Sequence, residues 1–461
     1  MSAPRGWFGR RGPASRIALG LLTLVVVIAA GAFAWYATTP KAMDFAGGNS
    51  VPVAEYRGGD STGVPASLKN ASLVKRGEYL ARAADCKVCH TAPGKQPYAG
   101  GFAFQLPFGT VYSPNITPDK ETGIGSYTGA QFLAAVHRGI RRDGARLYPA
   151  MPFASYTYMT DADALAIRAY LFSLAPVRHA VKADALSFPF NQRWLIGIWS
   201  WMFNANQRFQ PHPDRSPQWN RGAYIVEALA HCGECHTPRN LAFASNNRRK
   251  FAGAVTAGWR AYNISSDGST GVGAWSDRDL LAYMATGHAT GHGTASGPMG
   301  EAVGASFSAM APEDIRSVVA YLRSIPAQSS PDLPATLARP ASPSHRIGPR
   351  VATSLGKQIY EGACVTCHGW SGVSPIIPFA TLTGARAVND PSAINVAQVI
   401  VGGVRRTTPQ GLSRMPPFGH AYSDSEIAAV ANYVVARFGS KPSTIAGKDV
   451  AELRKQVAQT E

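Results

Sequence analysis

Cys86-Lys87-Val88-Cys89-His90 is the first of three stretches in this 461-residue chain that repeat the pattern Cys-x-x-Cys-His. The others are Cys232-Gly233-Glu234-Cys235-His236 and Cys364-Val365-Thr366-Cys367-His368, and together the three contain all 6 cysteines of the chain. Two residues between the cysteines bring both thiols along one edge of a porphyrin, where they add to its two vinyl groups. The next residue, histidine, projects under the ring and binds the iron. The pattern therefore predicts three covalently bound haem c groups.

Zinc binding, thioredoxin-like redox chemistry and structural disulfides fit the pattern less well. A zinc site needs four ligands, typically from paired Cys-x-x-Cys knuckles, and no such pair lies near any of the stretches. A thioredoxin-like site needs a β-α-β context, which the surrounding sequence lacks. Structural disulfides do not require a histidine after every second cysteine. Three copies that use every cysteine make haem attachment the preferred interpretation.

A sixth ligand for each iron has to come from the opposite side of the ring. Met151, Met299 and Met415 each follow a motif, precede the helix expected to close that repeat and have a proline beside them. Proline fixes the backbone and cannot continue a helix, so a loop there is suited to fold over a haem. A thioether ligand raises the reduction potential and leaves no open position on the iron. The predicted axial pairs are His90 with Met151, His236 with Met299, and His368 with Met415.

Other methionines and histidines provide the alternatives. Met159 and Met310 adjoin expected helix starts and Met284 lies within an expected helix, so these three are predicted to fill the core. Met43 and Met202 have no counterparts in the other repeats. Ligation by two histidines is the other option, although no histidine recurs at matching positions in all three repeats. The candidates for it are His137, His288, His292 and His420.

The N terminus has the pattern of an export signal. Four arginines among the first 16 residues precede an uncharged apolar run over residues 17–37. A helix over this run reaches about 30 Å, the thickness of a bilayer core. The basic side is expected to stay in the cytoplasm, which places the rest of the chain on the periplasmic side of the cell inner membrane. The alternative is a cleaved signal peptide with Ala32-Phe33-Ala34 as its cleavage site.

The first two motifs lie in a long internal repeat. Asn115-Ile116 recurs as Asn263-Ile264, and Thr122-Gly123-Ile124-Gly125 recurs as Thr270-Gly271-Val272-Gly273. A short helical pattern precedes each motif, and a stronger amphipathic helix closes each repeat. A helix, a motif, a loop rich in glycine and proline and a closing helix make one small all-α unit.

The expected organisation divides the chain into seven segments. They are an N-terminal anchor or signal (1–40), a first domain (65–185), an aromatic-rich connector (186–217), a second domain (218–328), a proline-rich linker (329–350), a third domain (351–440) and a polar tail (441–461). The connector is too short to span a bilayer and is expected to pack between the first two domains. A contact with a partner subunit or with the membrane surface is the alternative for it.

The composition narrows the classes of function. A mean hydropathy of −0.08 excludes a multi-span membrane protein, and a formal charge of +17 favours anionic partners. Because export is expected, the charge indicates a docking surface or contact with anionic lipid, and no nucleic acid is expected as a partner. No nucleotide-binding glycine fingerprint, catalytic triad or two-carboxylate site occurs in the sequence, so the chain is not expected to be an enzyme by itself.

The sequence resembles the triple-haem cytochrome c subunit of membrane-bound bacterial alcohol, gluconate, sorbitol and aldehyde dehydrogenase complexes. The resemblance covers nearly all of residues 68–440 and includes Leu147-Tyr148-Pro149-Ala150-Met151-Pro152. The other stretches that carry it are residues 85–91, 115–119, 219–222, 231–240, 296–299, 415–416 and 432–434.

The resemblance implies an all-α fold, in which an N-terminal transmembrane helix is followed by three tandem class I-type cytochrome c domains. It also implies a membrane-attached subunit that takes electrons from a catalytic dehydrogenase subunit carrying FAD, PQQ or molybdopterin and passes them to ubiquinone. Phe379, Leu382 and Arg437-Phe438-Gly439 favour the FAD-linked gluconate or sorbitol type. The alternatives are a cytochrome c subunit that feeds a terminal oxidase and a multihaem enzyme of the peroxidase type with one open iron.

Overall fold

The computed structural model describes residues 13–58, 62–330, 354–408 and 411–457. The chain divides into two units, Met1–Lys41 and Ala42–Glu461. The first unit contains the 25-residue helix α1 (Pro13–Ala37), and its apolar side chains, such as Leu22 and Phe33, are exposed. Most of the predicted proline-rich linker at 329–350 lies outside the described residues.

One prediction about the N terminus has to be corrected. Over the ranges that the structure covers, no helix combines the length and the apolarity needed to cross a membrane. An uncharged apolar run shows where a helix forms, and α1 does cover that run, but the run alone does not establish a membrane span. The prediction of an N-terminal transmembrane helix was therefore wrong.

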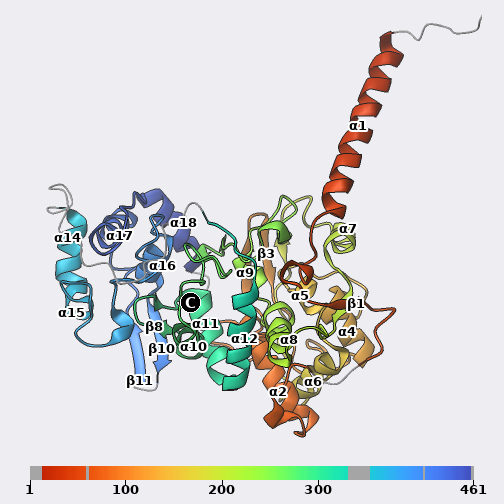
Figure 1. The fold of residues 1–461 in the computed structure, drawn as a ribbon, viewed down its shortest axis with the longest axis horizontal. Coiled ribbons are helices and arrows are strands. Elements are labelled where there is room, and N and C mark those ends of the chain that lie inside the picture. The colour runs from red at the N-terminus through yellow and green to blue at the C-terminus, as the bar shows by residue number, and fades with distance from the viewer. Residues whose placement is uncertain (1–12, 59–61, 331–353, 409–410, 458–461) are drawn as a thin grey trace, which may run out of the picture. The chain divides into compact units, whose positions relative to one another are not determined.

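The second unit is built from helices joined by long loops and small hairpins (Figure 1). The helices are α2 (Leu73–Ala83), α3 (Cys86–Cys89), α4 (Gly129–Arg138), α5 (Phe153–Tyr156), α6 (Asp161–Phe172), α7 (Trp194–Phe203), α8 (Pro217–Tyr224), α9 (Gly233–His236), α10 (Asp277–Thr286), α11 (Gly297–Ala305), α12 (Pro312–Ser324), α14 (Leu355–Ile359), α15 (Val365–His368), α16 (Ile394–Gly402), α17 (Asp424–Phe438) and α18 (Gly447–Val457). Two π-helical turns, η3 (Ile225–Leu229) and η6 (Tyr360–Cys364), and the 3₁₀ turn η7 (Pro378–Ala380) also matter for the site.

The all-α prediction was wrong as well, because the described residues also form five small antiparallel sheets. The pairs are β1 (Ser50–Pro52) with β5 (Gln207–Phe209), β2 (Ala103–Leu106) with β3 (Gly109–Tyr112), β3 with β4 (Ala185–Leu186), β6 (Ala254–Thr256) with β7 (Trp259–Ala261), β8 (His288–Ala289) with β9 (Gly293–Thr294), and β10 (Val404–Thr408) with β11 (Gly411–Met415). These strands have two to five residues. Such short strands show no recognisable alternation of polar and apolar residues, so the sequence pattern did not reveal them.

We refer to residues 65–185, 218–328 and 351–440, the three predicted domains, as repeats 1, 2 and 3. In each repeat the helix that precedes the motif crosses the closing helix at a glycine. The crossing pairs are α2 with α6, α8 with α12, and α14 with α17 (Figure 1). A methyl group at Gly77, Gly222 or Gly356 would overlap the backbone carbonyl of the facing helix. Glycine is therefore required where the two backbones approach each other most closely.

The substitution Gly222→Ala is expected to destabilise the protein by about 1–3 kcal/mol, because the added methyl group forces α8 away from α12. The measurement is the midpoint of thermal unfolding of the purified protein. Gly268→Ala is the matched control, since no atom of another residue lies near its added methyl group. Equal midpoints for the two variants would contradict the close crossing.

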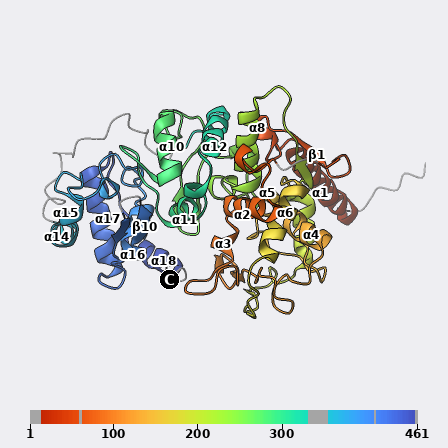
Figure 2. The ribbon, with the colours of Figure 1, turned by 90° about the horizontal axis from the view of Figure 1, so that it is seen from below.

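Repeats 1 and 2 share one hydrophobic core, which extends from Met43 to Ile325. Repeat 3 has a core of its own, which extends from Ile359 to Leu453 and includes side chains of the C-terminal helix α18. Figure 2 shows α10, α11 and α12 beside α16, α17 and β10, so repeat 2 lies between the other two repeats.

Two equivalent tyrosine contacts join repeats 1 and 2, because a tyrosine of each repeat donates a hydrogen bond to an aspartate of the other. Tyr79 on α2 donates a hydrogen bond to Asp314 on α12 and accepts one from the backbone N–H at the N-cap of that helix (3.1 Å). Tyr224 on α8 donates to Asp163 on α6 (2.6 Å) and accepts from the N-cap N–H of α6 (3.0 Å). Burial and the adjacent carboxylate raise the pKa of both tyrosines, so the phenols stay protonated donors. The two contacts are equivalent and clamp the repeats together.

Candidate functional site

Each Cys-x-x-Cys-His motif lies at the end of the opening helix of its repeat. In repeat 1, Asp85 adopts a left-handed conformation (φ 54°) between α2 and α3. In repeat 2, α8 continues into the π-helical turn η3, and the left-handed residue His231 (φ 37°) precedes α9. In repeat 3, the π-helical turn η6 leads directly into α15. Non-Gly residues at positive φ and π-helical turns are uncommon, and they gather at functional sites.

Each of the three motif histidines makes the same kind of hydrogen bond, from Nδ1 to a backbone carbonyl oxygen. The Nδ1 atom of His90 lies 2.8 Å from the carbonyl oxygen of Pro114, and that of His236 lies 2.6 Å from the carbonyl oxygen of Tyr262. The Nδ1 atom of His368 lies 2.6 Å from the carbonyl oxygen of Ala380. A carbonyl oxygen only accepts, so Nδ1 carries the proton in each ring. The lone pair of each Nε2 atom is therefore left to bind a metal.

The electrostatic surroundings keep these imidazoles neutral. Burial lowers the pKa of His90, His236 and His368, and the hydrogen bond to the carbonyl oxygen only partly opposes this effect. A neutral imidazole is the form that binds a metal. All three motif histidines are therefore prepared as ligands at neutral pH.

The loops that supply these carbonyl groups are held by the repeated sequence segments. Asn115 directly follows the residue that supplies the carbonyl group in repeat 1, and its Nδ2 atom donates to the hydroxyl of Thr122 (3.1 Å). Asn263 holds the same position in repeat 2 and donates to Thr270 (3.1 Å). The repeated Asn-Ile and Thr-Gly-x-Gly segments thus fix the loop that orients each histidine.

No disulfide joins the 6 cysteines, all of which lie among the described residues, and five of them are partly buried. Burial, first among the causes, raises the pKa of Cys86 and Cys232 to about 12 and that of Cys364 to about 11. Thiols in such apolar surroundings are protonated at neutral pH, unlike the reactive thiolates of redox enzymes and zinc sites.

The three candidate methionines pack against the same hydrophobic cores as the first cysteines of the motifs. Met151 and Met299 are partly buried and pack against the core that also contacts Cys86 and Cys232. Met415 packs against the core of repeat 3, which also contacts the first cysteine of its motif. Met151 lies in the turn before α5, Met299 in the first turn of α11 and Met415 at the end of β11. Met299 is thus on a helix and not in the expected loop.

The remaining methionines and histidines have different surroundings. Met159, Met284 and Met310 are buried among apolar side chains, as expected for core residues. The ring of His292 stacks on Trp275 with a centroid separation of 3.8 Å. For the three remaining candidate histidines, Nδ1 of His288 lies 2.9 Å from the hydroxyl of Thr294, Nδ1 of His137 lies 3.6 Å from Oδ1 of Asp161, and His420 is exposed.

Two family models match parts of the chain. Residues 74–175 match the model described as cytochrome c, and residues 351–434 match the model described as cytochrome c oxidase, cbb3-type, subunit III. The fructose dehydrogenase cytochrome subunit of Gluconobacter japonicus is 40% identical over 85% of this chain and 84% of its own length. The gluconate 2-dehydrogenase cytochrome c subunit of Pantoea cypripedii is 36% identical over 84% of this chain and 90% of its own length.

The chain belongs to the family of cytochrome c subunits of dehydrogenase complexes. A third relative, a nicotinate dehydrogenase subunit of Pseudomonas putida, is 39% identical over 81% of this chain, which spans only 31% of that longer protein. The resemblance found in the sequence is confirmed, and so is the interpretation of this cytochrome c subunit as an electron-transfer protein and not a catalytic enzyme.

The residues present fit covalent haem c. Each motif offers two thiols within one helical turn and a neutral imidazole whose Nε2 atom is available. When bound, haem c supplies one-electron oxidation and reduction of its iron. The carbonyl oxygens hold the imidazoles in one orientation and tautomer, and the first cysteine of each motif packs against an apolar core.

The motifs of repeats 1 and 2 lie next to each other in this cytochrome c subunit. Tyr156, at the end of α5, packs edge-on against His231 with a centroid separation of 5.4 Å and donates a hydrogen bond to the carbonyl oxygen of Ala84 (2.6 Å). Ser155 donates to Glu234, within the second motif (2.7 Å). Helix α11, which carries Met299, contacts both α3 and β10 (Figure 2). It therefore lies between the first motif and the hairpin that carries Met415.

Sequence reasoning missed the carbonyl acceptors of the motif histidines and the tyrosine exchange between repeats. The repeated Asn-Ile pair was a usable signal for the acceptors, because the residue before each Asn supplies the carbonyl group in repeats 1 and 2. No local pattern indicates Tyr79 or Tyr224, since their partners lie 235 and 61 residues away in the sequence.

Proposed function

We propose that the chain is a three-haem electron carrier made of three cytochrome c domains, residues 65–185, 218–328 and 351–440. Haem c would be attached at Cys86 and Cys89, at Cys232 and Cys235, and at Cys364 and Cys367, with the axial pairs His90 and Met151, His236 and Met299, and His368 and Met415. The observation that carries the proposal is the hydrogen bond from Nδ1 to a backbone carbonyl oxygen, which recurs at all three motif histidines.

The electron donor in this proposal is a separate catalytic dehydrogenase subunit with FAD, PQQ or molybdopterin, and the acceptor is ubiquinone. The names of the relatives support a dehydrogenase partner, since they are cytochrome subunits of fructose and gluconate dehydrogenases. Within the chain, the contacts of α11 with α3 and with β10 support a path from one repeat to the next. The proposed location is the periplasmic side of the inner membrane.

The absorption spectrum of the purified protein tests the ligand assignment. Sharp low-spin bands and three haems per chain are expected, because a methionine would fill the sixth position of each iron. A high-spin signal, or binding of carbon monoxide by most haems of the native reduced protein, would contradict the assignment and favour a haem enzyme with an open iron.

Affinity purification from the native membrane tests the partner. The protein is expected to copurify with a dehydrogenase subunit that reduces it on addition of its substrate. The second candidate function is a subunit that feeds a terminal oxidase, and the match of residues 351–434 to a cbb3-type oxidase subunit favours it. That match covers one repeat, whereas the dehydrogenase relatives cover more than four fifths of the chain. Copurification of a copper–haem oxidase instead would decide for the second candidate.

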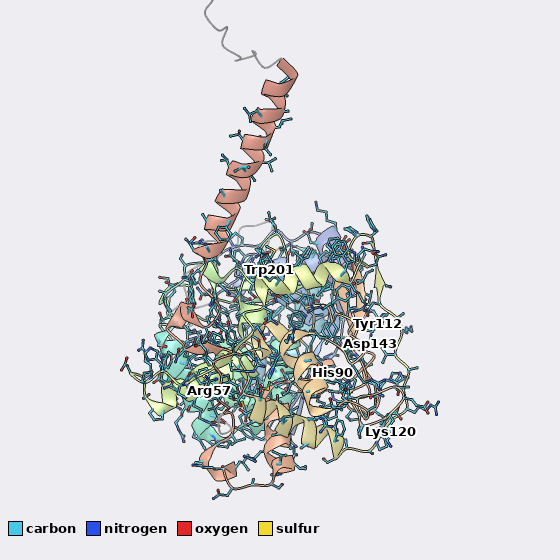
Figure 3. The ribbon with its side chains drawn as sticks, turned by 90° about the vertical axis from the view of Figure 1, so that its right-hand side faces the viewer. Arg57, His90, Tyr112, Lys120, Asp143 and Trp201 are labelled. Atoms are coloured by element: carbon cyan, nitrogen blue, oxygen red, sulfur yellow. The ribbon has the colours of Figure 1, made fainter. Side chains whose placement is uncertain are left out.

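An exposed aromatic patch supports contact with the membrane surface. Helix α7 exposes Trp194 and Trp201, the second of which is labelled in Figure 3, and Leu241 is exposed nearby. Trp201 is 79% exposed. The indole N–H of Trp199 donates to the carbonyl oxygen of Ala242 (2.8 Å), which holds α7 against the Leu241 loop. Tryptophan is enriched at membrane interfaces, and the net charge of +17 favours anionic lipid.

We expect the double substitution Trp194→Ser and Trp201→Ser to reduce binding to liposomes of phosphatidylethanolamine and phosphatidylglycerol at least tenfold, because two interfacial anchors are lost. A flotation assay measures the bound fraction. Trp370→Ser is the control, since this tryptophan is 65% exposed but lies on repeat 3. Unchanged liposome binding, with a weakened hold on the dehydrogenase subunit, would show that the patch binds protein.

A further inference from the structure

The carbonyl group that orients His236 belongs to a residue held by repeat 3. The phenolic oxygen of Tyr262 lies 3.3 Å from Oδ2 of Asp390 and accepts a hydrogen bond from Nδ2 of Asn395 (3.2 Å). Asp390 is buried, with 1% of its surface exposed. The backbone carbonyl oxygen of the same tyrosine accepts from His236 (2.6 Å). Tyr262 therefore joins the second motif histidine to buried polar groups of repeat 3.

The backbone beside Tyr262 is held by the same asparagine. The N–H of Arg260 donates to Oδ1 of Asn395 (2.8 Å), and Nδ2 of Asn395 donates back to the carbonyl oxygen of Arg260 (2.9 Å). The guanidinium of Arg260 also lies 3.1 Å from Asp390. Residues 260–262 are thus fixed by side chains of repeat 3 at three points.

At the third motif the roles of the two repeats are reversed, because repeat 2 holds a segment of repeat 3. His368 donates to the carbonyl oxygen of Ala380, which lies in η7. The preceding carbonyl oxygen, that of Phe379, accepts from the hydroxyl of Thr294 on β9 of repeat 2 (2.9 Å). The ring of Phe379 packs on His288 of β8 with a centroid separation of 4.9 Å. The segment that orients the third motif histidine is therefore held by a hairpin of repeat 2.

Repeat 1 differs from repeats 2 and 3 in the residues that hold the carbonyl acceptor of its motif histidine. The carbonyl group that orients His90 belongs to Pro114, and the next residue, Asn115, is held by Thr122 and by the carbonyl oxygen of Val177, all within repeat 1. The first motif histidine thus has an acceptor that does not depend on another repeat, which makes it an internal reference.

We propose that Tyr262 and Thr294 are positioning residues through which repeats 2 and 3 set each other's haem potential. A firmly held carbonyl oxygen strengthens the hydrogen bond from Nδ1 and makes Nε2 a stronger donor to iron, which favours the oxidised state. Loosening the carbonyl segment therefore raises the reduction potential of the haem on that side. The inference rests on the proposed function, because it requires haem at the second and third motifs.

A redox titration of the full-length holoprotein, followed by haem absorbance, tests this inference. Tyr262→Phe and Thr294→Val each remove one hydroxyl and keep the shape of the side chain. Tyr262→Phe is expected to raise the potential of the second haem alone, and Thr294→Val that of the third haem alone. Tyr283→Phe and Thr290→Val are the matched controls in repeat 2, and they are expected to leave all three potentials unchanged.

The inference is overturned if both hydroxyl deletions lower the midpoint of thermal unfolding but leave every potential at its wild-type value, since the contacts would then be structural only. An equal shift of all three potentials would overturn it too. The potential of the first haem and the haem content report whether each variant is folded. If the wild-type protein shows three reversible potentials, the proposed function stands whether or not the variants shift them. Fewer than three reversible potentials in the wild-type protein would overturn the proposed function itself.

Discussion

Met299→His is expected to lower the potential of one haem by roughly 0.1–0.3 V, within the range of about 0.8 V that axial ligands cover, and to slow electron transfer through the chain at least tenfold. A second imidazole stabilises the oxidised iron more than a thioether does. For a one-electron couple, about 59 mV corresponds to a tenfold change in the equilibrium constant, so the step onto this haem becomes strongly uphill.

Electron transfer through the chain is expected to slow strongly in Met299→His because of the position of Met299 in the fold. It is on α11, which contacts the first motif helix α3 and the hairpin strand β10 of repeat 3. Potentiometric titration and the rate of quinone reduction with the copurified dehydrogenase measure the two effects. Met310→Leu is the control, because Met310 is a buried core residue with the same chemistry. Three wild-type potentials in Met299→His would show that another residue is the ligand.

Asp314→Ala is expected to destabilise the protein by about 3–5 kcal/mol, the usual cost of breaking a buried ion pair. Asp314 has no exposed surface and accepts hydrogen bonds from Tyr79 and from the guanidinium of Arg221 (Nη2 to Oδ2 2.7 Å). Without the carboxylate, the partly buried guanidinium of Arg221 loses its counter-ion at the contact between repeats 1 and 2. A fall of the thermal midpoint by roughly 3–6 °C is expected for a unit as long as Ala42–Glu461.

The equivalent contact, between Tyr224 of repeat 2 and Asp163 of repeat 1, provides a second variant. Asp163 is equally buried and accepts from Tyr224 (2.6 Å), so Asp163→Ala is expected to destabilise the same contact. Asp277→Ala is the control, because Asp277 is 69% exposed and its ion pair with Arg323 is worth at most about 1 kcal/mol. If Asp314→Ala were as stable as this control, the clamp between the repeats would not contribute to stability.

Most of the features that could be predicted from the sequence follow from local patterns of residues. The cysteine and histidine spacing of the motifs is local, and the family comparisons confirm a cytochrome c subunit of a dehydrogenase complex. The repeated Asn-Ile pair marked loops that orient the histidines, although their role was visible only in the structure. The ligand residues and the division into three domains stay predictions.

Features that depend on distant residues could not be predicted. The hairpins have strands too short for a readable alternation, so the all-α expectation was wrong. The prediction of an N-terminal transmembrane helix was wrong, because an uncharged apolar run does not by itself establish a membrane span. The contacts of Tyr262 with Asp390 and of Thr294 with Phe379 join segments 128 and 85 residues apart, and no pattern in one segment reveals the other.

Intact mass spectrometry of the mature polypeptide, followed by peptide mapping, tests the central proposal most directly. A mass increase equal to three haem groups is expected, with one group mapped to each of the pairs Cys86 and Cys89, Cys232 and Cys235, and Cys364 and Cys367. Fewer than three adducts, or unmodified thiols at any of the three motifs, would contradict it.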